Sequence, residues 1–427
     1  MTDGDRRWTS CGVVVAFALL ATGCPKEAST AKPTWTGPVT TGQSTSAQRE
    51  SVAITVYNQN FGLVREVRNL DLPTGRVSLE FRDVAARIQP ETVHIKSLSS
   101  PDLFSVFEQN YRFDLLSPQK LLEKYVGKQV KIHRWNELLG KDDDFDATVL
   151  SIEGGSPVLQ IGDRVTYGFR GRISFPELPA NLIAKPTLVW LLGSGAPKQK
   201  VEVTYLTQSL NWRADYVMLV DEKDALADLQ GWVTLTNQSG ASYENARLKL
   251  VAGDVQKIQK EANFEAKPVT ITTAAMEPQA PAFHEEGFFE YHLYTLDQPT
   301  TVLDNEQKQV SLLEAKGVAV TKKLIFFGSN YYYRSSYGVV SSNQKVGVYL
   351  DLQNEEKNHL GIALPKGTVR VYKKDKSGQQ QFIGEDSIDH TPRDEKIRIK
   401  MGDAFDVVAD KKQTDWKPLG SCLSESA

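Results

Sequence analysis

Apolar and polar residues alternate with a period of two along most of the chain after residue 50. In 52–57, 76–81 and 92–98 the apolar residues are largely β-branched or aromatic, which is typical of antiparallel strands with one buried face. Similar runs continue at 186–192, 199–207, 213–220, 230–237, 246–252, 288–295, 307–313, 320–327, 345–353, 368–373 and 396–400. The chain is therefore expected to be mainly β, built from antiparallel β-sandwich domains.

One segment, 118–126, has a helical pattern. Ser117 can cap its first turn, Pro118 suits the first helical position, and Gly127 can end the helix. Short strands are expected directly afterwards, at 129–134, 147–153 and 157–161. A short helix followed by tightly connected strands predicts a small barrel-like unit.

These patterns suggest two folded domains and a tail. The first covers 51–185 and contains the short helix and the barrel-like unit, and the second is a β-sandwich over 186–416. Within the second, 256–284 loses the alternation and gains Ala, Pro and Thr, so a long insert is expected there. Residues 417–427 lack strand periodicity and are expected to be disordered.

The N-terminal residues have the features of a secretory signal. Two arginines, Arg6 and Arg7, precede an apolar run over 12–21 and a small-residue step before Cys24. The step resembles the lipobox of bacterial lipoproteins, although Ala21 stands where Leu is usual. We expect a signal peptide over 1–23 and lipidation of Cys24, for example with palmitate; ordinary secretion after Gly23, an uncleaved anchor and twin-arginine export are the alternatives.

Residues 24–50 are rich in Ser, Thr, Gly, Pro and Ala and contain few large apolar groups. Such a segment buries too little surface to offset its ordering entropy. A disordered tether between the anchor and the folded part is therefore expected. From the signal, the lipid anchor and the tether, we expect the protein in the bacterial cell envelope, anchored on the periplasmic side or at the cell surface.

The charge balance bears on the partners that the protein can bind, and the cysteine positions bear on whether it can form a disulfide. The 427 residues include 50 basic and 53 acidic side chains without a basic run, which argues against nucleic acid as a partner. The cysteines are at 11, 24 and 422, so removal of the signal and lipidation of Cys24 would leave one thiol and no internal disulfide. No second apolar run of membrane-spanning length occurs.

Two groups of residues resemble metal ligands without completing a known motif. Asp142, Asp144, Asp146 and Glu153 have calcium-loop spacing, but Ala147 replaces the glycine that the turn needs, so a solvated hairpin loop is expected. A second group, on an exposed loop and a strand, does not match the helical zinc pattern: His284, Glu285, Glu286 and His292. No metal or cofactor is expected.

A tyrosine cluster is the best candidate for a binding surface. Consecutive tyrosines cannot all face inward, and an exposed Tyr beside an Arg can bind a partner or a sugar face. Packing within a loop is the alternative. The candidate residues are Tyr331, Tyr332, Tyr333, Arg334 and Tyr337.

Long stretches of the chain resemble a bacterial family of exported proteins: 57–66, 117–132, 210–220, 231–255 and 288–315. The C-terminal part of that family is a domain of unknown function shared with mucoidy-inhibitor-A-type proteins. The resemblance covers about 50–416 and implies a β-rich envelope protein, without a reaction or site residue. Similar proteins continue beyond a segment like 401–416 with further strands, so a truncated chain with an unpaired last sheet edge is expected.

The expected function is that of a non-catalytic envelope lipoprotein that binds or scaffolds an unknown envelope protein or polysaccharide. The alternative is a hydrolase of an envelope polymer that uses carboxylates such as Asp254 or Glu290. Trp212 and Trp232 are expected in the core of the second domain.

Overall fold

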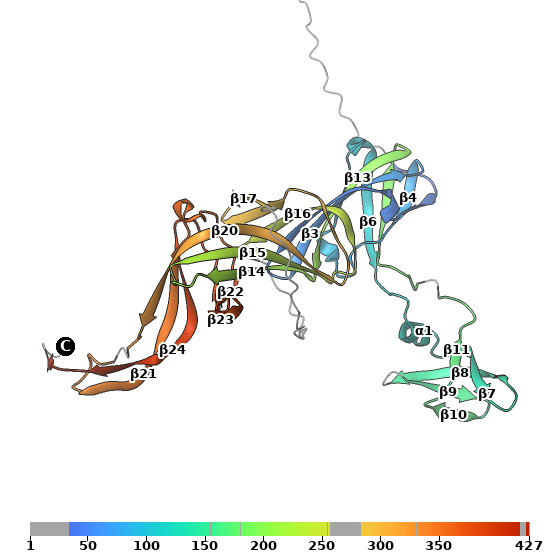
Figure 1. Ribbon diagram of the computed structural model, residues 1–427. Coiled ribbons are helices and arrows are strands. Elements are labelled where there is room, and N and C mark those ends of the chain that lie inside the picture. The colour runs from blue at the N-terminus through green and yellow to red at the C-terminus, as the bar shows by residue number, and fades with distance from the viewer. Residues whose placement is uncertain are drawn as a thin grey trace, which may run out of the picture. The chain divides into compact units, whose positions relative to one another are not determined.

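The computed structural model describes residues 34–153, 156–179, 181–253, 255–256, 283–328, 331–418 and 424–426. These residues form several β-sheets, as the sequence predicts, and within them α1 (Pro118–Lys124) is the single α-helix (Figure 1). Short 3-10 helices occur at Ser46–Gln48, Pro90–Thr92, Pro101–Leu103 and Glu356–Asn358.

An eight-stranded sheet has the order β17-β18-β16-β2-β3-β13-β5, with β19 also paired to β16. Most neighbours are antiparallel, but β16 and β2 are parallel. The strands are β2 (Arg49–Tyr57), β3 (Phe61–Asp71), β5 (His94–Ser97), β13 (Lys198–Gln208), β16 (Tyr243–Ala252), β17 (Phe283–Phe288), β18 (Tyr291–Leu296) and β19 (Thr300–Val302).

A four-stranded sheet with the order β1-β4-β12-β6 covers part of this layer. Arg68 of β3 lies 3.5 Å from the centre of the Phe81 ring of β4, so the two sheets face each other. The strands are β1 (Val39–Ser44), β4 (Gly75–Arg82), β6 (Phe104–Arg112) and β12 (Thr187–Ser194).

A seven-stranded sheet with the order β23-β22-β14-β15-β20-β21-β24 faces the other part of the eight-stranded sheet. Trp212 of β14 packs near Tyr294 of β18 and donates to the Val251 carbonyl of β16. The strands are β14 (Leu210–Val220), β15 (Leu226–Asn237), β20 (Glu306–Ile325), β21 (Val339–Gln353), β22 (Gly367–Lys374), β23 (Gln380–Ile388) and β24 (Lys396–Lys412).

The unit that follows α1 is a five-stranded sheet with its own small core around Ile132 and Val149. Its order, β10-β9-β8-β7-β11, brings the last strand back beside the first, as in a small barrel, but β10 and β11 do not pair, so the sheet stays open. The strands are β7 (Gln129–Asn136), β8 (Lys141–Glu153), β9 (Ser156–Ile161), β10 (Arg164–Tyr167) and β11 (Arg172–Ser174).

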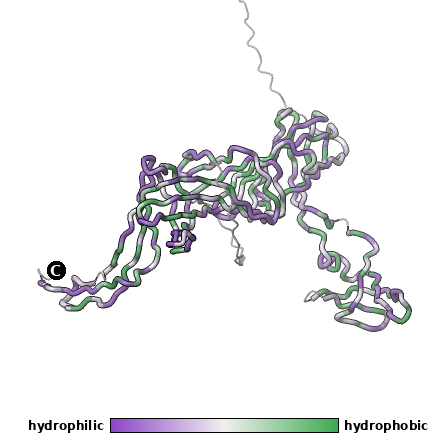
Figure 2. Tube along the Cα trace, viewed as in Figure 1, coloured by the Kyte–Doolittle hydropathy of each residue, from purple (hydrophilic) through white to green (hydrophobic). Residues whose placement is uncertain are grey.

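One continuous core runs between the eight-stranded sheet and the two sheets that face it. Figure 2 shows apolar and polar positions alternating along these strands, which is the pattern that predicted them. Trp212 is buried, as expected. Trp232 is half-buried and does not belong to the core, because its neighbours Gly231 and Val233 take the inward positions.

The sheets do not follow the expected boundary between 185 and 186. β3 pairs with β13 and β4 pairs with β12, so strands from both sides of that boundary share hydrogen bonds. The sandwich is therefore assembled from distant parts of the chain.

Both expected disordered segments contain strands. In the tether predicted over 24–50, β1 pairs in parallel with β4. Gly42 and Ser44 are buried there, because small side chains let β1 approach Leu72 and Val77 closely. In the tail predicted over 417–427, β25 (Trp416–Pro418) pairs with β26 (Ser424–Ser426). The signal, Cys24, Cys422 and nearly all of the expected insert lie outside the described residues.

Candidate functional site

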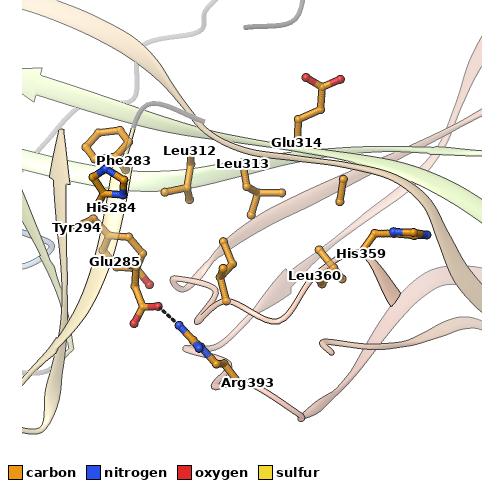
Figure 3. Close-up of a pocket in the computed structure, with 12 residues that line it drawn as sticks. Phe283, His284, Glu285, Tyr294, Leu312, Leu313, Glu314, His359, Leu360 and Arg393 are labelled. Carbon is orange, nitrogen blue, oxygen red and sulfur yellow. Dashed lines mark hydrogen bonds and ion pairs between the residues drawn. The ribbon is translucent and has the colours of Figure 1, made fainter. Parts of the chain in front are cut away.

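A cavity of about 310 Å³ lies between the eight-stranded and seven-stranded sheets (Figure 3). Its volume falls at the lower end of the roughly 300–1,000 Å³ that small-molecule sites occupy. We call it the interlayer cavity. Its lining comes from β17, β18, β20, the segment after the 3-10 helix 356–358 and the segment before β24: Phe283, His284, Glu285, Tyr294, Leu312, Leu313, Glu314, Ala315, His359, Leu360, Ile362 and Arg393.

A β-bulge shapes the apolar wall of the interlayer cavity. Ser311 pairs with Trp232 and Leu313 with Gly231, which leaves Leu312 as an extra residue in β20. Neighbouring side chains of a regular strand point to opposite faces. Here Leu312 and Leu313 are both buried and point to the same side in Figure 3. The carboxylate of the next residue, Glu314, points to the opposite side. The bulge therefore adds a second leucine to one wall.

An ion pair forms the polar edge of the cavity. The Glu285 carboxylate accepts from Arg393 Nη2 at 3.0 Å and lies 2.8 Å from His292 Nδ1 on the neighbouring strand β18. Burial raises the pKa of the Glu285 carboxyl, but the hydrogen bonds and charges of His292 and Arg393 outweigh burial and lower this pKa below its usual value. Glu285 is thus held ionised and paired.

The histidines and carboxylates of 284–286 and 292 do not converge on one point. His284 Nε2 lies 3.0 Å from Asp297 Oδ1, and Glu286 is exposed. His292 and Glu285 pair with each other. Among the described residues, no group of three or more His, Cys, Asp or Glu side chains has the arrangement of a metal site.

The acidic residues expected in a hairpin loop lie in a strand instead. β8 begins at Lys141, and three of its aspartates pair with basic or imidazole groups of the same sheet. Asp144 pairs with His133 and Asp146 with Lys131 on the neighbouring strand β7, and Asp142 pairs with Arg172 on β11, beyond β7. An extended strand spreads these carboxylates along one side of the sheet, whereas a calcium loop would fold them around one ion. Cross-strand pairing explains their spacing of two.

The tyrosine cluster lies in the connection between β20 and β21. Tyr331, Tyr333 and Tyr337 are exposed at 40%, 46% and 43%. Tyr332 is half-buried, and Lys411 Nζ lies 3.6 Å from the centre of its ring. The Arg334 guanidinium lies over the Tyr333 ring at 5.8 Å. We call these five residues, 331–334 and 337, the tyrosine surface.

Gln413, which follows β24, holds the tyrosine surface in place. Its side-chain amide donates to the backbone carbonyls of Tyr332 at 2.6 Å and Ser335 at 3.0 Å, and its side-chain oxygen accepts from the backbone N–H of Tyr337 at 2.7 Å. Trp416 adds a bond from Nε1 to the carbonyl of Tyr333. The loop backbone is thereby fixed at four points while three rings stay exposed.

Of the two carboxylates named for the hydrolase alternative, the structure describes only Glu290. Glu290 lies exposed in the turn between β17 and β18 and does not line the interlayer cavity. Asp254 lies outside the described residues. Within the described part of the chain, no helix has the length and apolar character to cross a membrane.

The interlayer cavity escaped the sequence reasoning although one signal marked it. Two adjacent leucines, Leu312 and Leu313, interrupt the alternation of β20 and indicate a bulge. Nothing in the sequence joins Arg393 to Glu285, which is 108 residues away. No family model, no curated protein and no solved structure matches this chain.

Proposed function

We propose that this chain is a lipid-anchored protein of the bacterial cell envelope that binds an envelope protein or polysaccharide and catalyses no reaction. Within this proposal it belongs to the exported family that it resembles, and the acyl group on Cys24 holds it to the membrane. The tyrosine surface is the contact site.

The carrying observation is that three exposed tyrosine rings sit on a backbone fixed by Gln413. Large aromatic side chains give much contact area, and holding them in place before binding lowers the entropy lost on association. Tyr and Arg are also enriched among the residues that dominate binding interfaces. Exposure and fixed geometry together favour recognition over loop packing.

Crosslinking in intact cells tests this proposal. Cells would carry either the natural chain or a variant with Tyr331→Ala, Tyr333→Ala and Tyr337→Ala, and the captured proteins and polysaccharides would be identified. We expect the amount of partner captured by the variant to be at least tenfold lower than the amount captured by the natural chain. Tyr167→Ala is a suitable control, because Tyr167 is a 69% exposed tyrosine on β10 of the five-stranded sheet. Undiminished capture by the triple variant would refute the assigned surface.

A further inference from the structure

We propose that the interlayer cavity binds a neutral apolar molecule of roughly ten carbon atoms, such as a medium-length alcohol or ester. This inference concerns a site separate from the tyrosine surface and does not depend on the proposed function. Three observations carry it: the chemistry of the walls, the pairing of the charged groups, and two departures from regular backbone that meet at the cavity.

The walls offer apolar surface to an occupant. Phe283, Leu312, Leu313 and Ala315 are buried side chains of the two facing sheets, and Ile362 packs against the same core from the connecting segment. The one hydroxyl among the lining residues, that of Tyr294, donates to the Ala363 carbonyl at 2.9 Å. An occupant therefore gains chiefly by removing apolar area from water.

The charged side chains around the cavity are already paired. Glu285 is bound by Arg393 and His292. The Glu314 side chain points away from Leu312 and Leu313 (Figure 3), and its Oε1 lies 3.1 Å from Lys316 Nζ as an ion pair but accepts no hydrogen bond from a described residue. A charged ligand would have to lose water without gaining an unpaired opposite charge, which is unfavourable. The pairing therefore selects an uncharged molecule.

Two irregular features converge on the cavity. The bulge at Leu312 interrupts the pairing of β20 with β15, and His359 has a left-handed backbone with φ of 61°. Both conformations cost free energy relative to regular structure, and such features concentrate at binding sites. Here the bulge supplies an additional leucine, and the turn at His359 directs the chain so that Leu360 and Ile362 complete the lining.

The volume sets the size of the occupant. About 310 Å³ corresponds to on the order of ten water molecules at roughly 30 Å³ each. A molecule of about ten non-hydrogen atoms would fill such a space, whereas a full-length phospholipid would not fit in it.

Calorimetry with the straight-chain alcohols from hexanol to dodecanol tests the proposal. The protein would be the full chain with Cys24→Ala, which removes any acyl group of its own from competition. We expect affinity to rise about three- to fourfold per methylene, since each buried methylene contributes about 0.8 kcal/mol, and to stop rising near ten carbons. Decanoate and decylamine, which are charged, should bind at least tenfold more weakly than decanol.

Two variants locate the binding. Ile362→Trp and the milder Ala315→Ile both reduce the space in the cavity, and each should weaken decanol binding at least tenfold. Val310→Trp is the matched control, because Val310 is also half-buried against the main core but does not line the cavity. Thermal melting would show that each variant is folded. No decanol binding, unchanged binding in a folded Ala315→Ile variant, or equal binding of decanoate and decanol would overturn the proposal.

Discussion

At the scale of single residues, Arg68 is a fully buried cation whose charge and hydrogen-bond donors must be satisfied inside the protein. Its side chain is fully buried and donates to Glu66 at 3.0 Å, to the Arg82 carbonyl at 2.9 Å and to the Ser44 hydroxyl at 3.3 Å. Its guanidinium also covers the Phe81 ring. A buried charge is tolerated only when its donors and its counter-charge are all satisfied, and β1, β3 and β4 meet here to satisfy them.

Arg68→Ala should lower the free energy of unfolding by about 3–5 kcal/mol, because it leaves the buried Glu66 carboxylate with Arg49 as its one remaining ionic partner among the described residues. Urea denaturation followed by circular dichroism would measure the change. The double variant Glu66→Gln with Arg68→Met removes both charges and should recover part of the loss. If Arg68→Ala unfolds at the same urea concentration as the natural chain, the buried pair is not needed for stability.

Trp212 and Trp232 differ in burial and should therefore differ in their contribution to stability. Trp212→Ala removes a buried ring that packs near Tyr294 and should cost about 3–5 kcal/mol. Trp232→Ala removes a half-buried ring and should cost about 1 kcal/mol. The difference between their melting temperatures tests the assignment, and equal effects would contradict it.

At the scale of elements, Asp351 joins three strands of the seven-stranded sheet. Its carboxylate on β21 accepts from Arg398 of β24 at 2.8 and 3.1 Å, from Lys396 of β24 at 2.7 Å and from Lys323 of β20 at 2.9 Å. The hydrogen bonds of Arg398, followed by those of both lysines, hold the Asp351 pKa far below its usual range despite burial.

This cluster should make stability depend on pH. A carboxyl whose pKa is lower in the folded than in the unfolded chain stabilises the fold above the unfolded value of about 4, and this contribution is lost as the pH falls toward the folded value. Asp351→Asn should therefore cost about 1–3 kcal/mol at pH 7 and progressively less below pH 4. Denaturation curves at pH 7, 5 and 3 would show it, and a pH-independent difference would contradict the argument.

How far the sequence predicts these elements depends on what each one needs. The alternation in 199–207 and 246–252 is enough to place β13 and β16. The alternation does not reveal which strands pair with β13 and β16, because pairing between distant strands leaves no local pattern in the sequence. β1 was missed for a different reason: Gly42 and Ser44 look like a flexible linker, but their small size is what close packing requires.

The tyrosine surface and the interlayer cavity also differ in how far the sequence predicts them. The exposure of the tyrosine surface follows from consecutive aromatic residues, which cannot share one face, and was predictable. The interlayer cavity depends on β17, β20 and a segment before β24 meeting in space. Only the Leu312–Leu313 pair gave a local sign of it.

At the scale of the whole molecule, attachment to the membrane is the property that the proposed function needs most. Cys24→Ala should abolish labelling with a tagged fatty acid and move the protein from the membrane to the soluble fraction, because the thiol is the acceptor of the lipid. Cys422→Ala is the matched control and should change neither result. A labelled Cys24→Ala protein would refute the anchor.

The parallel pairing of β2 with β16 also governs when the molecule can fold. β2 ends at Tyr57 and β16 begins at Tyr243, so a long loop must close before this contact forms, and folds dominated by such contacts fold slowly. Until residues 243–252 emerge during synthesis or export, one edge of β2 stays without its partner. A half-made chain therefore presents an open strand edge to other chains, and correct folding depends on keeping that edge from pairing with them until β16 has been made.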